Sequence, residues 1–326
     1  MVDSFMNIAM PGIHHITAIA GDPQTNIDFY TSVLGLRLVK LTINFDDPGT
    51  YHFYYADYAG RPGTVLTFFP WEGAPRGRTG AGQVTAFGFL ISEDSVDYWV
   101  RRLNKHNIPF QGPGERFDER VITFLDPDGI ELELVTRKNV PDNDDPRFGP
   151  VPTDFAIRGF HGVTLTLAAY ERTAGLLTET FGYTALSETG SRFRYDTLSG
   201  EVGTVVDILR EPSASAPKGE MGAGSVHHIA FRTPDDEHQL AFRERLSELK
   251  FDVTPVRDRQ YFHSIYFQEP GGVLFEIATD NPGFETDESL ENLGTSLKLP
   301  PWYERDRSSI ESLLAPVQLP KETVSR

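Results

Sequence analysis

PGGVLFEI, residues 270–277, is the stretch of sequence that decides the fold, and VHHI, residues 226–229, is its companion. If each stretch forms a β-strand, its side chains alternate between the two faces of a sheet. Alternation gives Glu276 and His228 each a defined face, so a carboxylate and an imidazole can meet across one sheet. The rest of the chain can be understood as the framework that brings such groups together.

A second copy of the histidine strand lies far upstream, as IHHIT at residues 13–17. This copy would supply His15 to the point at which His228 and Glu276 meet. Two histidines and one carboxylate, with coordination positions left open, are typical of non-haem ferrous iron. The sequence therefore predicts a metal site built from three strands that are far apart in the chain.

The chain repeats one unit of a strand, a helix and three strands four times between residues 12 and 280. In the first copy, the strand 13–20 ends at Gly21-Asp22-Pro23, where a cap and a first-turn proline predict a helix of about 12 residues. The turns DDPG at 46–49 and GRPG at 60–63 then separate three β-like runs, at 36–44, 51–58 and 64–69. In the fourth copy, Thr233 and Pro234 are the expected cap and first helical residue. The predicted fold class is α+β.

Two segments have the composition of linkers. KNVPDNDDP, residues 138–146, is acidic and contains two prolines, and it separates two halves, 12–137 and 155–280. The second loose segment, 212–224, precedes the fourth copy. Residues 281–326 form a C-terminal tail, in which we expect a short helix at 310–314 and docking of aromatic and leucine side chains on the body.

Composition excludes several classes of protein. With 326 residues, 39% of them hydrophobic, the chain can fill the cores of two globular domains. Its net charge of −17, from 30 basic and 47 acidic residues, would repel nucleic acid and anionic membranes. Because there is no cysteine, a metal would have to bind to His, Asp or Glu. The sequence shows no basic leader and no apolar run of about 20 residues, so we expect a soluble, cytoplasmic protein.

Superposing the four copies compares their candidate site positions. In the opening strands, His15 and His228 occupy one position, at which the second copy has Ala86 and the third has Gly162. In the closing strands, aligned on their last glycine, the residues that match Glu276 in copies one, two and three are Thr67, Glu133 and Asp207. Carboxylates therefore occur in three copies, but the histidine occurs only in copies one and four.

Two ways of pairing the copies give different sites. Pairing copy one with copy four unites His15, His228 and Glu276. Pairing one with two and three with four would instead leave His15 with Glu133, and His228 with Glu276 and Asp207. The first pairing suits iron better, so we expect a cleft between copies one and four and structural roles for Glu133 and Asp207. Each match also has an ordinary explanation, since a histidine pair can be a polar strand edge and a glutamate can pair with an arginine.

Four strings of residues resemble a known family. They are HHITAIAGDPQ at 14–24, DFYTSVLGLRLVKLTINFDDP at 28–48, VHHIAFRT at 226–233 and SIYFQEPGGVLFEIATD at 264–280. With the tandem units, they resemble the vicinal oxygen chelate superfamily and, within it, hydroquinone-type ring-cleaving dioxygenases such as the chlorohydroquinone 1,2-dioxygenases. The resemblance covers nearly the whole chain. It implies two barrel-like domains, each made from a pair of units, and an extradiol-type non-haem iron dioxygenase that degrades aromatic compounds.

The resemblance also implies which groups act at the site. His15, His228 and Glu276 would hold Fe(II), with Mn(II) as the alternative ion, and the substrates would be a small hydroquinone-type diol and O2. The residues that would act beside the metal are His14, Thr17, His227, Arg259 and Tyr266. In this hypothesis His227 and Tyr266 serve as acid–base groups or donors to an oxyanion, and Arg259 holds the distal hydroxyl.

Strand alternation places some of these residues more simply than others. Thr17 is two residues from His15 and lies on its face. His14 and His227 should point to the opposite face unless twist or a bulge turns them. Tyr266 lies on an expected neighbouring strand.

Other side chains around the site are less determined. Either Arg257 or Arg259 turns inward, and the sequence leaves open which one does. Aromatic residues of the first copy could form a wall for the substrate ring: Phe45, Tyr51 and Phe53.

Two other functions remain open from the sequence. One is a glyoxalase-type lyase on zinc or nickel, which normally uses a ligand set richer in carboxylate, whereas Thr67 occupies the position that would supply it. The other is a metal-free protein that sequesters a quinone or a drug. The oligomeric state is also open, with a homodimer as one arrangement.

Overall fold

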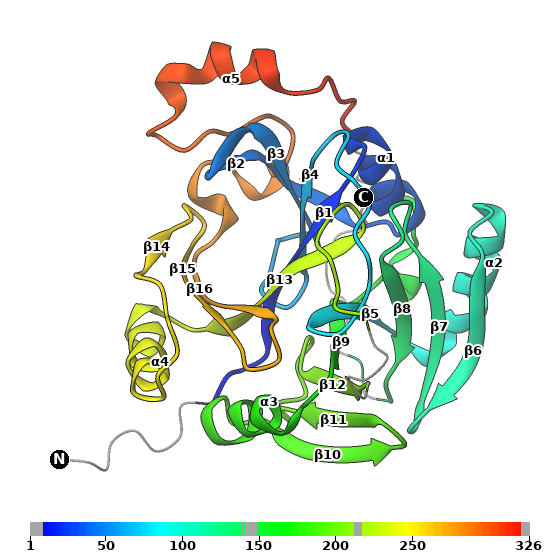
Figure 1. Cartoon of the computed structure of the whole chain (residues 1–326). Coiled ribbons are helices and arrows are strands. Elements are labelled where there is room, and N and C mark those ends of the chain that lie inside the picture. Colours follow the sequence, from blue (N-terminus) through cyan, green and yellow to red (C-terminus); the bar gives the residue numbers. More distant parts are fainter. Residues whose placement is uncertain (1–8, 139, 141–148, 212–216, 321–326) are drawn as a thin grey trace.

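Two curled sheets of eight strands each form the body of the protein (Figure 1). The computed structural model describes residues 9–138, 140, 149–211 and 217–320, and these statements refer to them. The first sheet has the strand order β14-β15-β16-β13-β1-β4-β3-β2, and the second has the order β10-β11-β12-β9-β5-β8-β7-β6. The architecture is the α+β fold of paired units that the sequence predicted.

The first sheet joins unit one to unit four. Its strands are β1 (Ile13–Ala20), β2 (Arg37–Asn44), β3 (Asp47–Ala56), β4 (Val65–Pro70), β13 (Ser225–Thr233), β14 (Arg257–Asp258), β15 (Phe262–Gln268) and β16 (Leu274–Pro282). The opening strands β1 and β13 pair antiparallel at the centre, and each pairs parallel with the closing strand of its own unit, β4 or β16.

The second sheet joins unit two to unit three in the same way. Its strands are β5 (Gln83–Ile91), β6 (Phe110–Arg116), β7 (Glu119–Leu125), β8 (Glu131–Thr136), β9 (Phe160–Leu167), β10 (Thr184–Thr189), β11 (Arg192–Asp196) and β12 (Val205–Arg210). Here β5 and β9 are the central antiparallel pair. Each sheet therefore takes one unit from each half of the chain, 12–137 and 155–280. The exact bounds of these halves stay a prediction. Residues 139 and 141–146 of the first expected linker and 212–216 of the second lie outside the described residues, whereas Lys218, Glu220 and Ala223 of the second form β-bridges to unit one's closing loop.

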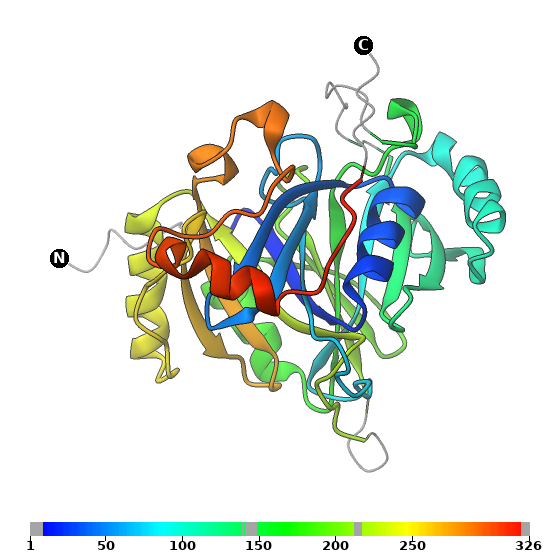
Figure 2. The same ribbon diagram turned by 90° about the horizontal axis from the view of Figure 1, so that it is seen from above.

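Helices lie at the periphery of the sheets (Figure 2). The α-helices are α1 (Pro23–Asp28), α2 (Val96–Lys105), α3 (Glu171–Gly175), α4 (Asp236–Glu248) and α5 (Arg307–Leu313). Turns of π-helix extend α1 and α3, at Phe29–Val33 and Leu176–Thr180, and short 3-10 turns occur at Glu93–Ser95, Thr153–Phe155, Phe284–Thr286, Leu290–Asn292 and Glu304–Asp306. None of the described helices has the length and apolar character needed to cross a membrane.

Local signals predicted some element boundaries and misplaced others. Asp22 caps α1 as expected, since its side chain accepts from the Thr25 N–H. The cap of α4 is Asp235, whose carboxylate accepts from the His238 N–H, and the expected cap Thr233 is still in β13. The expected turn at 46–49 is also wrong, because Asp47 already pairs with Asn44, so the hairpin turns within two residues.

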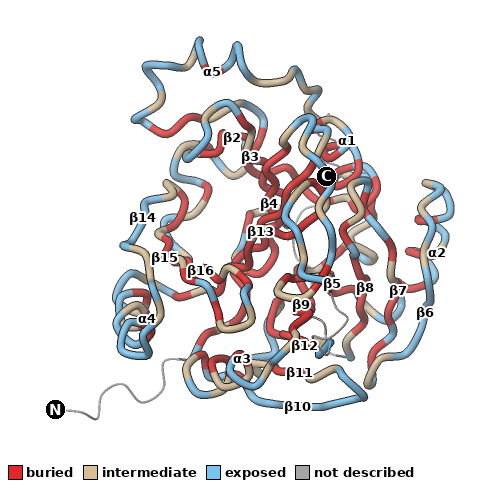
Figure 3. The backbone as a smooth tube through the Cα atoms, viewed as in Figure 1, coloured by how far each residue is buried: buried red, intermediate tan, exposed pale blue. Residues whose placement is uncertain are grey.

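The core lies between the sheets and under the helices, as the burial of the central strands shows (Figure 3). A contiguous cluster of buried apolar side chains draws on all four units, with Ile16, Phe87, Leu165 and Phe231 among its members. Because the central strands are buried on both faces, their polar residues must be satisfied within the protein.

The C-terminal tail docks on unit one, and α5 lies across β2 and β3 (Figure 2). The buried ammonium group of Lys40 contacts Asp287 and Glu288 at 2.5 Å each, and Arg37 donates to two carbonyl groups of the 3-10 turn Leu290–Asn292. Ile310 packs on Ile43 near the hairpin turn. The tail therefore holds β2 and β3 from outside.

Candidate metal centre

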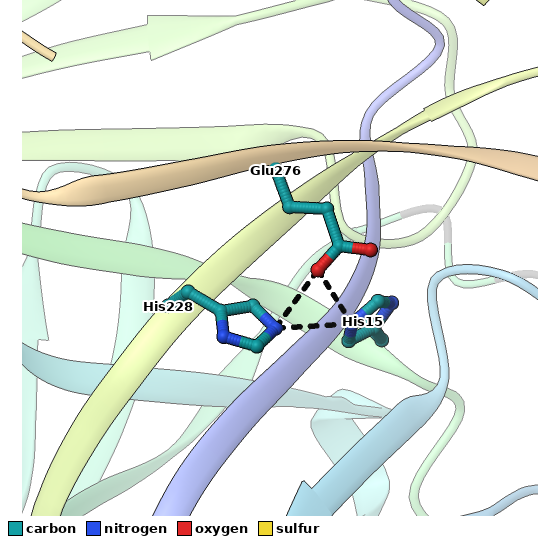
Figure 4. A group of neighbouring side chains, drawn as sticks. All are labelled: His15, His228 and Glu276. Carbon is teal, nitrogen blue, oxygen red and sulfur yellow. Dashed lines mark hydrogen bonds and ion pairs between the residues drawn. The ribbon is translucent and has the colours of Figure 1, made fainter. Parts of the chain in front are cut away.

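Three side chains from three strands converge on one buried point in the first sheet (Figure 4). His15 comes from β1, His228 from β13 and Glu276 from β16, and the ligand atoms that they offer lie within 4.8 Å of one another. The Nε2 atoms of the two histidines are 3.4 Å apart. Glu276 Oε2 lies 2.9 Å from His228 Nε2 and 3.4 Å from His15 Nε2. The structure thus brings together the three residues that the sequence predicted as ligands.

The strand pairing explains this convergence. β13 lies between β1 and β16, so His15, Ala230 and Glu276 form one row across three adjacent strands. His228 is two residues before Ala230 and shares its face. All three candidate ligands therefore point to the same side of the first sheet.

A β-bulge in each opening strand turns the preceding histidine toward its neighbour. The pairing of β1 with β13 shifts by one residue at His14 on β1, and it shifts again at His227 on β13. A bulge re-aims side chains that would otherwise follow the alternation of the strand. As a result, His14 Nδ1 lies 3.0 Å from His15 Nδ1, and His227 Nδ1 lies 2.8 Å from His228 Nδ1.

The contact with His14 orients the ring of His15. Binding of a metal through His15 Nε2 requires the proton on His15 Nδ1, which is then donated to His14 Nδ1. Histidines that bind metals are commonly oriented by a hydrogen bond of this kind.

Burial and mutual contact shift the protonation of these groups. Burial would raise the pKa of Glu276, but the imidazoles of His15 and His228 lower it well below its usual range. Burial lowers the pKa of His228, although Glu276 opposes the shift. Burial and the adjacent His228 lower the pKa of His227 to about 4. At neutral pH Glu276 is therefore a carboxylate, and His227 and His228 are neutral, which are the forms that metal binding requires.

The donor set fits a divalent metal ion. Glu276 is fully buried, and its Oε1 atom accepts from Ser264 Oγ at 2.5 Å, yet its Oε2 atom accepts no hydrogen bond from the described residues. A buried carboxylate oxygen without a donor is costly unless a cation faces it. Two imidazole nitrogens and one carboxylate oxygen, open on one side, suit a transition metal ion. His15, His228 and Glu276 could therefore hold such an ion between them.

The group forms part of the wall of a cavity of about 470 Å³. Units one and four alone contribute its lining, so the cavity lies within the first sheet. The predicted residues Thr17, His227, Arg259 and Tyr266 line it, whereas His14 lies behind His15. This volume is in the range of pockets that bind small molecules.

Arg259 and Tyr266 lie together on the unit-four side of the cavity. Arg259 Nε donates to Tyr266 Oη at 3.1 Å, and another guanidinium nitrogen contacts Asp46 of unit one at 2.9 Å. The side chain of Arg257 is 49% exposed and that of Arg259 is 18% exposed, so Arg259 is the arginine that turns inward. Burial raises the pKa of Tyr266, which keeps its phenol protonated at neutral pH.

A hydrogen-bonded chain on the unit-one side was not predicted from the sequence. Thr17 Oγ1 and Thr67 Oγ1 are 2.8 Å apart, and His52 Nε2 lies 2.8 Å from the same Thr67 oxygen. Tyr54 Oη lies 2.9 Å from His52 Nδ1. Alternation along β3 was the signal that could have found these residues, because it places His52 and Tyr54 on the face opposite Phe53.

The expected aromatic wall is partly wrong. Phe45 lines the cavity, but Phe53 is fully buried in the main core, and the Tyr51 hydroxyl donates to the Ala315 carbonyl at the tail. These two residues alternate onto the core face of β3, so the cavity receives other aromatic side chains. They are His52, Tyr54, Phe69 and Trp71.

Comparison with known proteins agrees with this architecture. The sequence model of the Glyoxalase/Bleomycin resistance protein/Dioxygenase superfamily matches residues 12–134 and 159–277. The chain is 48% identical to "Putative ring-cleaving dioxygenase MhqO" of Bacillus subtilis, over 94% of this chain and 97% of that protein. It is 33% identical to the chlorohydroquinone/hydroquinone 1,2-dioxygenase of Sphingobium indicum, over 90% of this chain and 92% of that protein.

A solved crystal structure supports the same assignment. It is that of a "putative dioxygenase" from Bacillus subtilis subsp. subtilis str. 168, with a TM-score of 0.92 and 47% sequence identity. The match covers 96% of this chain and 99% of that one. With its two matched halves, its sheet order and its relatives, the chain belongs to the Glyoxalase/Bleomycin resistance protein/Dioxygenase superfamily.

Proposed function

We propose that this protein is an Fe(II)-dependent ring-cleaving dioxygenase that acts on hydroquinone-type aromatic diols. The observation that carries the proposal is the buried group of His15, His228 and Glu276, which is open to a cavity on one side. A facial set of two histidines and one carboxylate is typical of Fe(II) oxygenases, and Mn(II) is the alternative ion. The names of the relatives support the reaction class, since all of those compared above are described as dioxygenases.

The substrate class rests on one relative and on the cavity. The relative from Sphingobium indicum is named as a dioxygenase of chlorohydroquinone and hydroquinone. A cavity of about 470 Å³ accommodates a single aromatic ring with small substituents. Its lining is largely aromatic and uncharged next to the metal group, which favours a flat and neutral substrate.

The residues of the chain have distinct roles in this proposal. When bound, the ferrous ion supplies a redox-active Lewis acid at which a diol and O2 can react. His227 is neutral at neutral pH and lies at the cavity wall. With His228 bound to a metal through Nε2, His228 Nδ1 donates to His227 Nδ1, so His227 carries its own proton on Nε2 and can donate a hydrogen bond to a substrate oxygen. Tyr266 stays a phenol and receives a hydrogen bond from Arg259, which leaves its own proton free to donate to a substrate oxygen.

Arg259 and the residues behind the ligands complete the site. The guanidinium of Arg259 places a fixed positive charge beside the cavity, where it can stabilise the developing negative charge of a substrate oxygen. His14 and Thr17 do not need to touch the substrate. His14 orients His15 through their Nδ1 contact, and Thr17 bonds Thr67 across the neighbouring strands.

The lyase alternative has less support from the site. Among the described residues, the group that could hold a metal contains a single carboxylate. Thr67 occupies the matching position on unit one, and its hydroxyl is engaged by Thr17 and His52. A metal-free binding protein would leave Glu276 Oε2 buried without a compensating cation.

Oxygen uptake tests the proposal directly. The protein is loaded with Fe(II) under anaerobic conditions and then offered hydroquinones and catechols in air-saturated buffer. We expect stoichiometric O2 consumption with a hydroquinone-type diol, and loss of this activity in Glu276→Gln. If no diol of the panel gives O2 consumption in a protein that retains iron, the proposed function is wrong.

A further inference from the structure

Units one and four place matching residues in matching registers around the metal group. On unit four, Tyr266 of β15 is opposite Glu276 of β16. On unit one, Tyr54 of β3 is opposite Thr67 of β4. The two halves of the cavity are therefore related by an approximate twofold repeat, in which a threonine stands where the other half has a glutamate.

The residue that supports this position is also matched. Two residues before the tyrosine, unit four has Ser264 and unit one has His52. Ser264 donates to Glu276 Oε1, and His52 Nε2 lies 2.8 Å from Thr67 Oγ1. A supporting hydrogen bond is thus present on both sides, although unit one has a threonine in place of the carboxylate.

This difference removes a charged side chain from the unit-one side of the metal group. A threonine side chain is two carbon–carbon bonds shorter in reach than a glutamate and carries no charge at neutral pH. Thr67 is fully buried, and the surface that the cavity meets on this side includes the imidazole of His52. The imidazole of His52, which is hydrogen-bonded to Thr67, therefore forms the cavity wall on this side.

The imidazole of His52 is fixed in place and belongs to a row of rings. Its ring centre is 4.1 Å from that of Tyr54 and 4.4 Å from that of Phe69, and Trp71 stacks on Phe69 at 5.8 Å. Both of its nitrogens already have hydroxyl partners, in Thr67 and Tyr54. A neutral imidazole has no further donor or acceptor to offer, so it presents its ring to the cavity.

The charged residues of the cavity lie elsewhere. Asp46, Asp47 and Arg257 are exposed at the mouth of the cavity, where Asp47 accepts a hydrogen bond from Trp71 Nε1 at 3.2 Å. Arg259 connects Asp46 to Tyr266. The charged groups other than the metal group are therefore at the open side and on unit four. A flat, uncharged ring fits the unit-one side, while polar substituents fit the side of Arg259 and Tyr266.

We infer that the substrate ring packs against a wall formed by His52, Phe69 and Trp71. Within this wall, His52 is the positioning residue nearest the metal group. This inference rests on the proposed function and adds to it the side on which the ring lies. His52 acts as a wall, held by Thr67 and Tyr54, and takes no part in metal binding or proton transfer. The ligand class that fits this wall is an uncharged aromatic diol with apolar ring substituents.

Affinity measurements on two substitutions test the inference. His52→Ala removes the ring, and His52→Phe keeps a flat ring but removes both hydrogen bonds. Binding of hydroquinone to the Fe(II)-loaded protein is measured anaerobically by calorimetry, together with iron content and thermal unfolding. We expect His52→Ala to weaken binding by about tenfold, His52→Phe to stay within about threefold of the wild type, and iron content to be unchanged in both.

A matched control is His263→Ala. His263 is a half-exposed imidazole on β15 that contacts Asp236 outside the cavity, and its removal should leave hydroquinone affinity unchanged. Wild-type affinity in a folded His52→Ala protein would overturn the inference. So would a His52→Phe protein that binds as weakly as His52→Ala, because the hydrogen bonds would then matter and the ring would not. A wild-type protein that consumes no O2 with any diol refutes the proposed function itself, which separates the two failures.

Discussion

The two sheets of this protein are built on one plan, and they neutralise buried carboxylates in different ways. Both sheets have one bulge in each opening strand, at His14 and His227 in the first and at Thr85 and His161 in the second. Both also bury carboxylates on closing strands. The difference between them lies in the cations that face these carboxylates.

In the second sheet, arginines face the carboxylates that match Glu276. Arg116 donates to both oxygens of Glu133, at 2.7 and 2.6 Å. Arg194 donates to both oxygens of Asp207, at 2.8 and 3.0 Å. Glu133 and Asp207 therefore have the contacts of structural residues, which agrees with the prediction made from the lack of a histidine at the positions of units two and three that match His15.

The first sheet has no arginine at the corresponding position. Arg194 is opposite Asp207 in the second sheet, whereas Tyr266 is opposite Glu276 in the first. Glu276 Oε2 instead faces two imidazole nitrogens. The comparison teaches that this fold supports a buried carboxylate at this register when a cation faces it. That cation is a guanidinium in the second sheet and, in our proposal, a metal ion in the first.

Among the substitutions that test this difference between the sheets, Glu276→Gln should have the largest effect, which is on metal binding. The amide keeps the shape of the side chain but removes its charge, so we expect Fe(II) affinity to fall by at least about 100-fold. Iron content after anaerobic loading and desalting measures the effect. The control is Glu133→Gln, which changes the matched carboxylate of the second sheet and should leave iron content unchanged. Equal iron in Glu276→Gln and the wild type would contradict the proposed metal site.

Arg194→Met should have the next largest effect, on stability rather than on iron. It leaves Asp207 and Glu119 buried without their shared cation, which should lower the free energy of unfolding by about 3–5 kcal/mol. Urea denaturation of the metal-free protein measures the loss. Adding Asp207→Asn to this variant should recover part of it, because the uncompensated charge is then removed. An unchanged midpoint for Arg194→Met would show that arginine does not hold this cluster.

Much of the first sheet could be predicted because its signals are periodic. A repeated HH pair and a repeated glycine-rich turn define registers, and registers in a sheet determine which residues meet. This is why the sequence alone predicted that His15, His228 and Glu276 meet, although they come from the separate stretches 13–17, 226–229 and 270–277. The pairing of unit one with unit four was predicted because it gave the ligand set better suited to iron.

The remaining features depend on contacts that have no local signal. Arg194 and Glu119 are paired across strands of different units, and neither sits in a repeated motif. His52 was not predicted because it lies in an aromatic run of which Tyr51, Phe53 and Tyr55 face the core. The docking of the tail depends on Lys40, a residue inside a strand that the sequence alone would expose to solvent. The partners of these charged residues lie far along the chain, since 75 positions separate Glu119 from Arg194 and 248 separate Lys40 from Glu288.

The pH dependence of stability should sharpen the contrast between the sheets. Burial would raise the pKa of Glu119, but His161 and Arg194 lower it from 4.5 to about 2. A carboxyl group whose pKa is depressed by folding stabilises the protein above its unfolded pKa, and this contribution is lost as pH falls from about 4.5 toward 2. Its size is on the order of 3 kcal/mol.

The difference between the wild type and Glu119→Gln isolates this contribution. Both proteins are unfolded with urea, without metal, at pH 7 and at pH 3. We expect the wild type to be the more stable at pH 7 and the gap to narrow at pH 3. A gap that stays constant between these pH values would mean that Glu119 is not held as a carboxylate by His161 and Arg194.

Ser264→Ala should have the smallest of these effects. It tests the hydrogen bond that orients Glu276 in the first sheet. Ser264 donates to Glu276 Oε1, so its removal leaves that oxygen without a donor and lets the carboxylate rotate. Hydrogen bonds to a ligand from the residues behind it are typically worth 10- to 100-fold in metal affinity, and we expect about tenfold here. Competition with a chelator measures the change. Ser247→Ala removes an exposed hydroxyl on α4 and serves as the control. In the second sheet the residue that matches Ser264 is Arg192, which contacts Asp207 with a full charge. A loss in Ser264→Ala as large as that in Glu276→Gln would mean that orientation, and not charge, dominates metal binding in the first sheet.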